Sequence, residues 1–201
     1  MLPVSPRRTW LDGRIDVFMA ETQRLGLVCP REPVGLEIQA RVEAVATALR
    51  VTEQTARRDF DDETIQNMAQ NMAFQLAREQ PGADILTLAP THVLSTALAG
   101  RTNAGLAVGA QLALTASPTT NIPDQIHQVV DLVFFWGILI ERSAARPGQV
   151  AVPEALIHRT VREFGKAIAL LDAGARPADG GDPTELRVAL TDNVTALEST
   201  L

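Results

Sequence analysis

The strongest constraint on the fold is a stripe of apolar residues in the C-terminal part of the chain. Its members follow one another at steps of four, three, four and three residues: Ile157, Val161, Phe164, Ile168 and Leu171. Side chains at this spacing lie on one face of an α-helix, and that face has to be covered by a partner that runs along it. We therefore expect a helix that begins at Pro153 and packs lengthwise on another helix.

Similar stripes recur in most of the chain. They fall in residues 11–25, 38–49, 65–76, 126–140 and 186–201. Residues 91–116, rich in Ala, Gly, Leu and Thr, are predicted to be helical as well, with a break possible at Gly100 or Gly105. Aromatic residues make up only 4% of the chain and tyrosine is absent, so the core must be aliphatic, which favours helix over sheet. With no evident pair of strands, the prediction is an all-α fold of about eight or nine helices.

Serine, aspartate and proline mark where several helices should begin. Ser5-Pro6 can open the first helix, and Asp182-Pro183 can open the last one, with a cap followed by a first-turn proline. Residues 27–35 contain Pro30, Pro33 and Gly35 and are predicted to form a loop.

Several classes of protein are disfavoured. A single cysteine, Cys29, allows neither an internal disulfide nor a cysteine metal cluster. The N-terminal residues do not look like a signal peptide, and the longest apolar run, within 129–140, is too short to span a bilayer and contains Asp131. We expect a cytoplasmic protein with no membrane segment.

The chain also lacks the sequence signs of catalysis. The three histidines (His92, His127 and His158) show no metal-ligand spacing, and no nucleophile motif is present. The expectation is a protein that is not an enzyme and carries no cofactor or metal.

The segment Val45–Phe60 is typical of two helices joined by a tight turn. Ala46 is small enough for two helices to cross closely, Val51 is expected to be buried in the turn, and Thr52 can cap the second helix. Arg50 falls at the turn position where a left-handed backbone is expected. This is the pattern of a helix-turn-helix, which places its second helix in the major groove of DNA.

The outward face of the second helix is polar, and its inward face carries Ala56 and Phe60. The residues expected to face DNA are Thr52, Glu53, Gln54, Thr55, Arg57 and Arg58. Glutamine and arginine can read adenine and guanine edges, and arginine and threonine can bind phosphates. The alternative interpretation is an ordinary helical hairpin with solvated charges.

A family resemblance follows from these residues. The pattern resembles the DNA-binding helices of DeoR-type and tetracycline-repressor (TetR) regulators: Ala46-x-x-Leu49-x-Val51-Thr52-x-x-Thr55-x-Arg57-Arg58-Asp59-Phe60. Because Asp61-Asp62-Glu63 leads directly into another helix, without a β-wing, the architecture is more similar to the TetR type. The resemblance implies an N-terminal helix-turn-helix bundle in residues 1–62 and a helical ligand-binding and dimerisation body in residues 63–201.

The charge distribution is compatible with a local DNA contact. The net charge of −6 divides into +1 for residues 1–60, which hold 9 arginines and 8 acids, and −7 for residues 61–201, which hold 9 basic and 16 acidic residues. A near-neutral N-terminal part on an acidic body allows binding through a patch and argues against sequence-blind binding along the duplex.

The remaining expectations concern partners. The chain is expected to bind operator DNA as a homodimer through residues 153–172 and 183–200. A small-molecule effector, if there is one, should lie near Gln111, His127, Phe134 and Trp136. Alternatively, Phe134 and Trp136 are simply core aromatics. The alternative function is an all-helical protein-interaction module with no nucleic-acid role. A third possible function is that of a helical enzyme or ligand carrier, which would need His127 and a carboxylate in one pocket.

Overall fold

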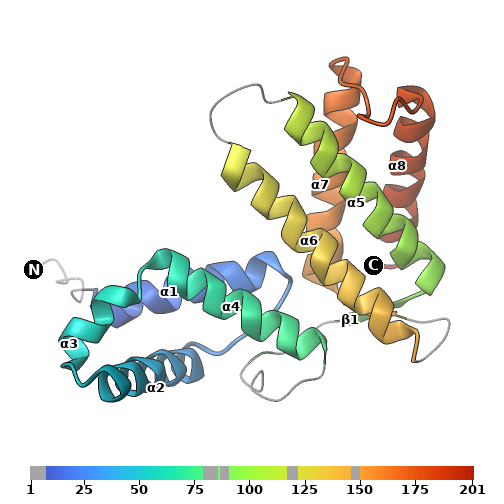
Figure 1. The fold of residues 1–201 in the computed structure, drawn as a ribbon. Coiled ribbons are helices and arrows are strands. Elements are labelled where there is room, and N and C mark those ends of the chain that lie inside the picture. The colour runs from blue at the N-terminus through green and yellow to red at the C-terminus, as the bar shows by residue number, and fades with distance from the viewer. Residues whose placement is uncertain (1–7, 79–85, 87–90, 117–121, 146–149) are drawn as a thin grey trace, which may run out of the picture. The chain divides into compact units, whose positions relative to one another are not determined.

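The computed structural model describes residues 8–78, 86, 91–116, 122–145 and 150–201, with only the backbone described for 122–128. The chain forms two compact units, Met1–Thr87 and Leu88–Leu201, which are described separately below. Figure 1 labels the main elements. The expectation of a mostly helical fold is confirmed.

Unit 1 is built on its first helix. Its elements are α1 (Trp10–Arg24), α2 (Arg31–Leu49), α3 (Glu53–Ala56), the 3-10 turn η1 (Arg57–Asp59) and α4 (Asp62–Ala77). Helix α1 packs against both α2 and α4, and Phe18 of α1 is the largest fully buried side chain described in unit 1. Ile38 from α2 and Ile65 from α4 are also fully buried. The short α3–η1 segment joins the ends of α2 and α4 (Figure 1).

Unit 2 is a helical bundle with a small sheet. Its elements are β1 (Thr91–Leu94), α5 (Thr96–Ala116), α6 (Ile122–Ser143), β2 (Val150–Pro153), α7 (Glu154–Asp172) and α8 (Pro183–Glu198). Helix α5 contacts α6, α7 and α8, so it lies at the centre of the bundle. The predicted lengthwise packing of the stripe on α7 is confirmed, since Ile157 and Phe164 are fully buried and α7 packs on α5 and α8.

The small sheet was not predicted. Strands β1 and β2 pair antiparallel, with Thr91 opposite Pro153 and Leu94 opposite Val150. The prediction that residues 91–116 are entirely helical is therefore wrong for residues 91–95, because α5 begins at Thr96. Side chains of β2 alternate, with Val150 and Val152 buried and the residue between them exposed, a period-two pattern too short to be recognised in the sequence.

Helix starts differ from the prediction at two places. Helix α1 begins after Thr9, whose hydroxyl accepts from the Asp12 amide while the Asp12 carboxylate accepts from the Thr9 amide, a capping box. The predicted Ser5-Pro6 start lies outside the described residues. Helix α2 begins at Arg31, so residues 31–35 of the predicted loop 27–35 are helical. Pro33 fits in this first turn because the N–H groups there have no intrahelical acceptor, so a residue without an N–H loses no hydrogen bond.

Two other start and break predictions can be compared directly. Asp182 caps α8 through the Thr184 amide at 2.8 Å, as expected. Helix α5 runs through Gly100 and Gly105 without a break.

The division between the units falls after Thr87, whereas the sequence placed it after residue 62, because α4 packs on α1 and belongs to the N-terminal core.

The two glycines of α5 give a matched stability test. A Cβ at Gly105 would lie 3.0 Å from two ring carbons of the fully buried Phe164 and 3.2 Å from the buried Leu190, whereas at Gly100 no described atom lies within 4 Å. Gly100→Ala is expected to stabilise unit 2 by about 0.5–1 kcal/mol through helix propensity. Gly105→Ala is expected to destabilise it by about 1 kcal/mol, because overpacking outweighs that gain. Urea unfolding followed by circular dichroism measures both, and equal stabilisation by the two variants would contradict close packing at Gly105.

Candidate nucleic-acid interface

The turn between α2 and α3 is closed by backbone hydrogen bonds. Arg50 adopts the left-handed conformation with φ 55° and ψ 42°, and it is the only non-glycine residue with positive φ among those described. The Val51 amide donates to the Ala46 carbonyl at 3.0 Å, and the Arg50 amide donates to the Thr47 carbonyl at 3.3 Å. This pair of bonds is a Schellman motif, which ends a helix and turns the chain sharply.

The second helix is capped as predicted but is short. The Thr52 hydroxyl accepts from the Thr55 amide at 3.2 Å. Four α-helical residues are followed by the three residues of η1, so the segment from Glu53 to Asp59 has about two turns. Ala56 is fully buried and Phe60 nearly so, which confirms the predicted inward face.

The prediction that Val51 is buried in the turn is wrong. Its side chain is 39% exposed. The turn needs no apolar plug, because the backbone bonds of the Schellman motif hold it and because Ala46 and Ala56 provide the buried surface of α2 and α3. Backbone closure of this kind cannot be read from residue types alone.

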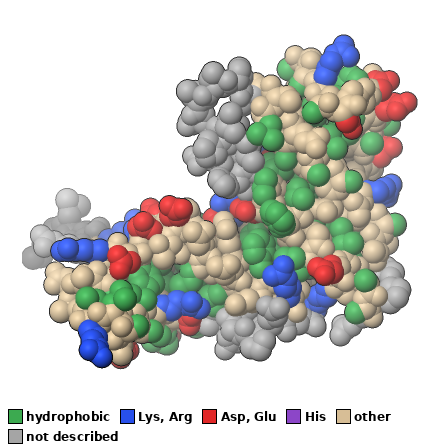
Figure 2. Space-filling model, in the orientation of Figure 1, with side chains coloured by type: hydrophobic (Ala, Val, Ile, Leu, Met, Phe, Trp, Pro, Cys, Tyr) green, Lys and Arg blue, Asp and Glu red, His purple; other side chains and the backbone are tan. Residues whose placement is uncertain are grey.

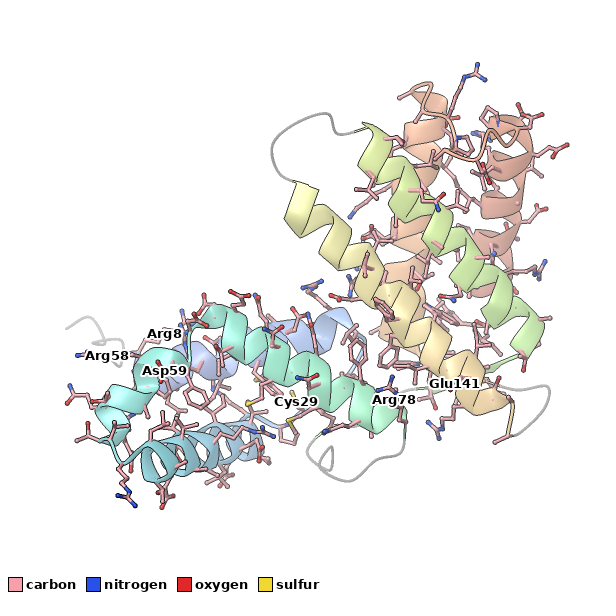
Figure 3. The ribbon with its side chains drawn as sticks, viewed as in Figure 1. Arg8, Cys29, Arg58, Asp59, Arg78 and Glu141 are labelled. Atoms are coloured by element: carbon pink, nitrogen blue, oxygen red, sulfur yellow. The ribbon has the colours of Figure 1, made fainter. Side chains whose placement is uncertain are left out.

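The paired arginines have different surroundings. An Nη2 atom of Arg57 lies 3.4 Å from the Glu53 carboxylate, and the guanidinium carbon lies 5.3 Å from the ring centroid of Trp10. Arg58 is exposed and forms no ion pair with any residue that the structure describes; Figure 3 shows it extending outward at the α3 end of unit 1. Arg57 is therefore held in place by two neighbours, whereas Arg58 has no such partner among the described residues.

The acids that follow the motif are used elsewhere. The Asp61 carboxylate caps α4 by accepting from the Thr64 amide at 2.8 Å, and this hydrogen bond holds the pKa of Asp61 below its usual value. Asp62 pairs with Arg14 at 2.6 Å, and Arg14 also donates to the Phe60 carbonyl. Within the described part of the chain, neither acid neutralises Arg57 or Arg58.

All six predicted DNA-facing residues lie together on α3, its N-cap and η1, and all are exposed: Thr52, Glu53, Gln54, Thr55, Arg57 and Arg58. The hydroxyls of Thr52 and Thr55 lie 3.0 Å apart and bond to each other. The segment thus presents one amide, two guanidiniums, one carboxylate and two hydroxyls to solvent.

Of the four predicted ligand residues, the three whose side chains the structure describes lie in different surroundings. Trp136 is fully buried, and its indole Nε1 donates to the Thr160 hydroxyl at 3.0 Å, as expected of a core aromatic. Phe134 is 62% exposed and Gln111 is also exposed. The side chain of His127 lies outside the described residues.

Among the described residues, each unit has one hollow of several hundred Å³. A hollow of about 530 Å³ in unit 2 is lined by Leu106, Gly109, Ala113, Val129, Glu163, Phe164, Lys166, Ala167, Ala169 and Leu170. A groove of about 740 Å³ in unit 1 is lined by Arg41, Ala44, Val45, Phe60, Thr64, Asn67, Met68, Asn71, Met72, Phe74, Gln75 and Arg78. Neither of these linings includes Gln111, Phe134 or Trp136.

Two histidines that seemed isolated in the sequence converge on one acid. His92 Nε2 lies 3.3 Å from one oxygen of Glu154, and His158 Nε2 lies 3.7 Å from the other. The unpredicted pairing of β1 with β2 brings His92 close to the start of α7, which explains why the sequence gave no sign of it. Among the described residues, no group of three acids, histidines or cysteines is arranged to hold a metal ion.

The described helices include none with the length and hydropathy needed to cross a bilayer. Comparison with known proteins gave no match to a family model, to a curated protein or to a solved structure.

Proposed function

We propose that the chain is a DNA-binding transcriptional regulator that reads operator DNA through the α3–η1 segment. One observation carries the proposal: the Schellman turn at Arg50, followed directly by the Thr52 cap, joins two helices whose small residues Ala46 and Ala56 are both buried. Such a turn between two closely crossing helices is typical of a helix-turn-helix.

Each exposed side chain of the segment has a role in this proposal. Gln54 and Arg58 read base edges, because an amide can pair with adenine and a guanidinium with guanine. Thr52 and Thr55 bind phosphate oxygens beside them. Glu53 positions Arg57, to which it is paired, and can accept a hydrogen bond from cytosine.

The proposed regulator is a homodimeric repressor that responds to a small molecule. Dimerisation through residues 153–172 and 183–200 would place two recognition segments about one turn of DNA apart. Apolar side chains support an interface there, since Val161 and Ile168 of α7 are partly exposed and Val188 of α8 is 53% exposed.

The proposal is tested by selecting bound sequences from random duplex DNA with the full chain. We expect enrichment of a short motif that recurs as an inverted repeat, with half-sites about one turn apart. Binding to the enriched sequence should weaken steeply with salt, because arginines displace counterions from phosphates. A final pool indistinguishable from the input would remove the regulator from consideration.

A protein-interaction module is the second candidate function, and local charge favours it. Residues 50–63 hold 3 arginines and 5 acids, a net charge of −2 beside the segment that would approach phosphates. A selection without enrichment, together with an intact fold by circular dichroism, would leave this candidate as the better supported one.

A further inference from the structure

The groove between α2 and α4 of unit 1 is a second feature able to bind a partner. Its volume of about 740 Å³ lies within the range of small-molecule sites in proteins. The helices that form its walls are both packed on α1, and α2 and α4 form few direct contacts with each other. Figure 2 shows hydrophobic side chains gathered between these two helices on the visible face of unit 1.

The floor of the groove is apolar. Met68 and Met72 line it from α4, Val45 lines it from α2, and Phe60 lines it from the end of η1. The methionines and Phe60 are nearly buried, at 8%, 2% and 6% exposure, so only a small part of each side chain faces the groove. Thioether side chains adapt their shape to an apolar guest.

The rim of the groove is polar and, where it is charged, positive. Asn67, Asn71 and Gln75 follow one face of α4 at steps of four residues, and Arg41 and Arg78 are the charged residues of the lining. The lining contains no acid, although the chain as a whole has a net charge of −6. This makes the groove complementary to an anion.

The two arginines differ in how far they are already engaged. Arg41 pairs with Glu37 one turn away on α2 at 2.6 Å, an exposed pair of modest strength. Arg78, at the C-terminal end of α4 (Figure 3), forms no ion pair with a described residue. Arg78 is therefore the main anchor for a negative charge, with the amide of Gln75 one turn from it.

We propose that this groove binds an amphipathic small molecule with an apolar body and one carboxylate. The apolar body covers Met68, Met72 and Phe60, and the carboxylate accepts hydrogen bonds from Arg78 and from the neighbouring amides. Such charge-assisted hydrogen bonds are stronger than neutral ones. Binding of such a molecule does not require the proposed DNA-binding function. A ligand in the groove nevertheless contacts Val45 of α2 and Phe60 at the end of η1, which both belong to the turn motif.

The test uses decanoate as the probe and decanol as its uncharged match, with binding measured by isothermal titration calorimetry on the full chain. Decanoate should bind at one site. Decanol should bind at least about tenfold more weakly than decanoate. Arg41→Gln with Arg78→Gln should weaken decanoate about tenfold, the loss expected for a charge-assisted hydrogen bond. The same change at Arg101 and Arg162, two exposed arginines of unit 2, should leave it unaltered.

A pair of tryptophan variants tests the location of the site. Ala44 lines the groove and Ala48, one turn further along α2, does not, and both side chains are exposed. Ala44→Trp should fill the groove and abolish decanoate binding, whereas Ala48→Trp should leave it unchanged. The proposal is overturned if decanoate does not bind, if decanol binds as tightly, or if the two tryptophan variants bind decanoate equally. Circular dichroism of each variant separates a blocked groove from a lost fold.

Discussion

Replacing Arg57 and Arg58 together with alanine is expected to weaken binding to the selected operator by about a hundredfold. Each arginine that contacts a base or a phosphate contributes about 1–3 kcal/mol, so two lost contacts amount to about 3 kcal/mol. The slope of the logarithm of the binding constant against the logarithm of salt concentration should also fall by about 2. Electrophoretic retardation at several salt concentrations measures both effects.

The single variant Arg58→Ala separates recognition from folding. Arg57 has intramolecular neighbours in Glu53 and Trp10, so removing it also removes a cation–π contact of about 0.5–1 kcal/mol. Arg58 has no ion pair with a described residue, and its loss should leave the thermal unfolding of the chain unchanged while operator binding falls about tenfold or more.

The control for the double variant is Arg101→Ala with Arg162→Ala. These two arginines are exposed on α5 and α7, and their removal changes the net charge by the same amount. If the control weakens operator binding as much as the Arg57 and Arg58 variant does, the effect belongs to overall charge and the α3–η1 segment is not the DNA-reading element.

The helical architecture could be predicted because it depends on spacing. The stripe on α7 predicts one apolar face on a helix of 3.6 residues per turn. Its members Ile157, Phe164 and Leu171 are buried as expected, whereas Val161 and Ile168 are partly exposed. Local caps were also predictable, as Thr52 and Asp182 show, because a hydroxyl or carboxylate can bond to an amide two or three residues later whatever the rest of the chain does.

The features that were missed depend on contacts between distant residues or on the backbone. Pairing of β1 with β2 joins segments about sixty residues apart, and neither is long enough to show alternation. The exposure of Val51 follows from a turn closed by amide and carbonyl groups, which every residue carries. Burial by neighbours explains why Phe134 and Trp136, two apart on one apolar helix, differ completely in exposure.

The groove of unit 1 was missed for a related reason. Met68 and Met72 fit a core stripe in the sequence, and they are nearly buried. What makes them the floor of a groove is the separation of α2 from α4, both of which rest on α1. The sequence pattern shows which face of a helix is apolar, but the spacing of two helices held by a third depends on the whole core.

Trp136→Ala is expected to destabilise unit 2 by about 3–5 kcal/mol, the usual cost of removing a large buried aromatic. The side chain is fully buried, and its indole hydrogen bond to Thr160 would be lost as well. The Thr160 hydroxyl would still donate to the Leu156 carbonyl at 2.7 Å, so the main cost is the cavity. Since the free energy of unfolding of native proteins is about 5–15 kcal/mol, this single change removes a large part of it.

Phe134→Ala is the matched control, because it removes an aromatic ring two residues away on the same helix. Phe134 is 62% exposed, so its removal should change the unfolding free energy by less than about 0.5 kcal/mol. Urea unfolding followed by circular dichroism measures both variants. In Trp136→Ala the remaining fluorescence comes from Trp10 of unit 1, which shows whether that unit stays folded when unit 2 is weakened. Losses of similar size for the two variants would contradict the placement of Trp136 in the core and of Phe134 on the surface.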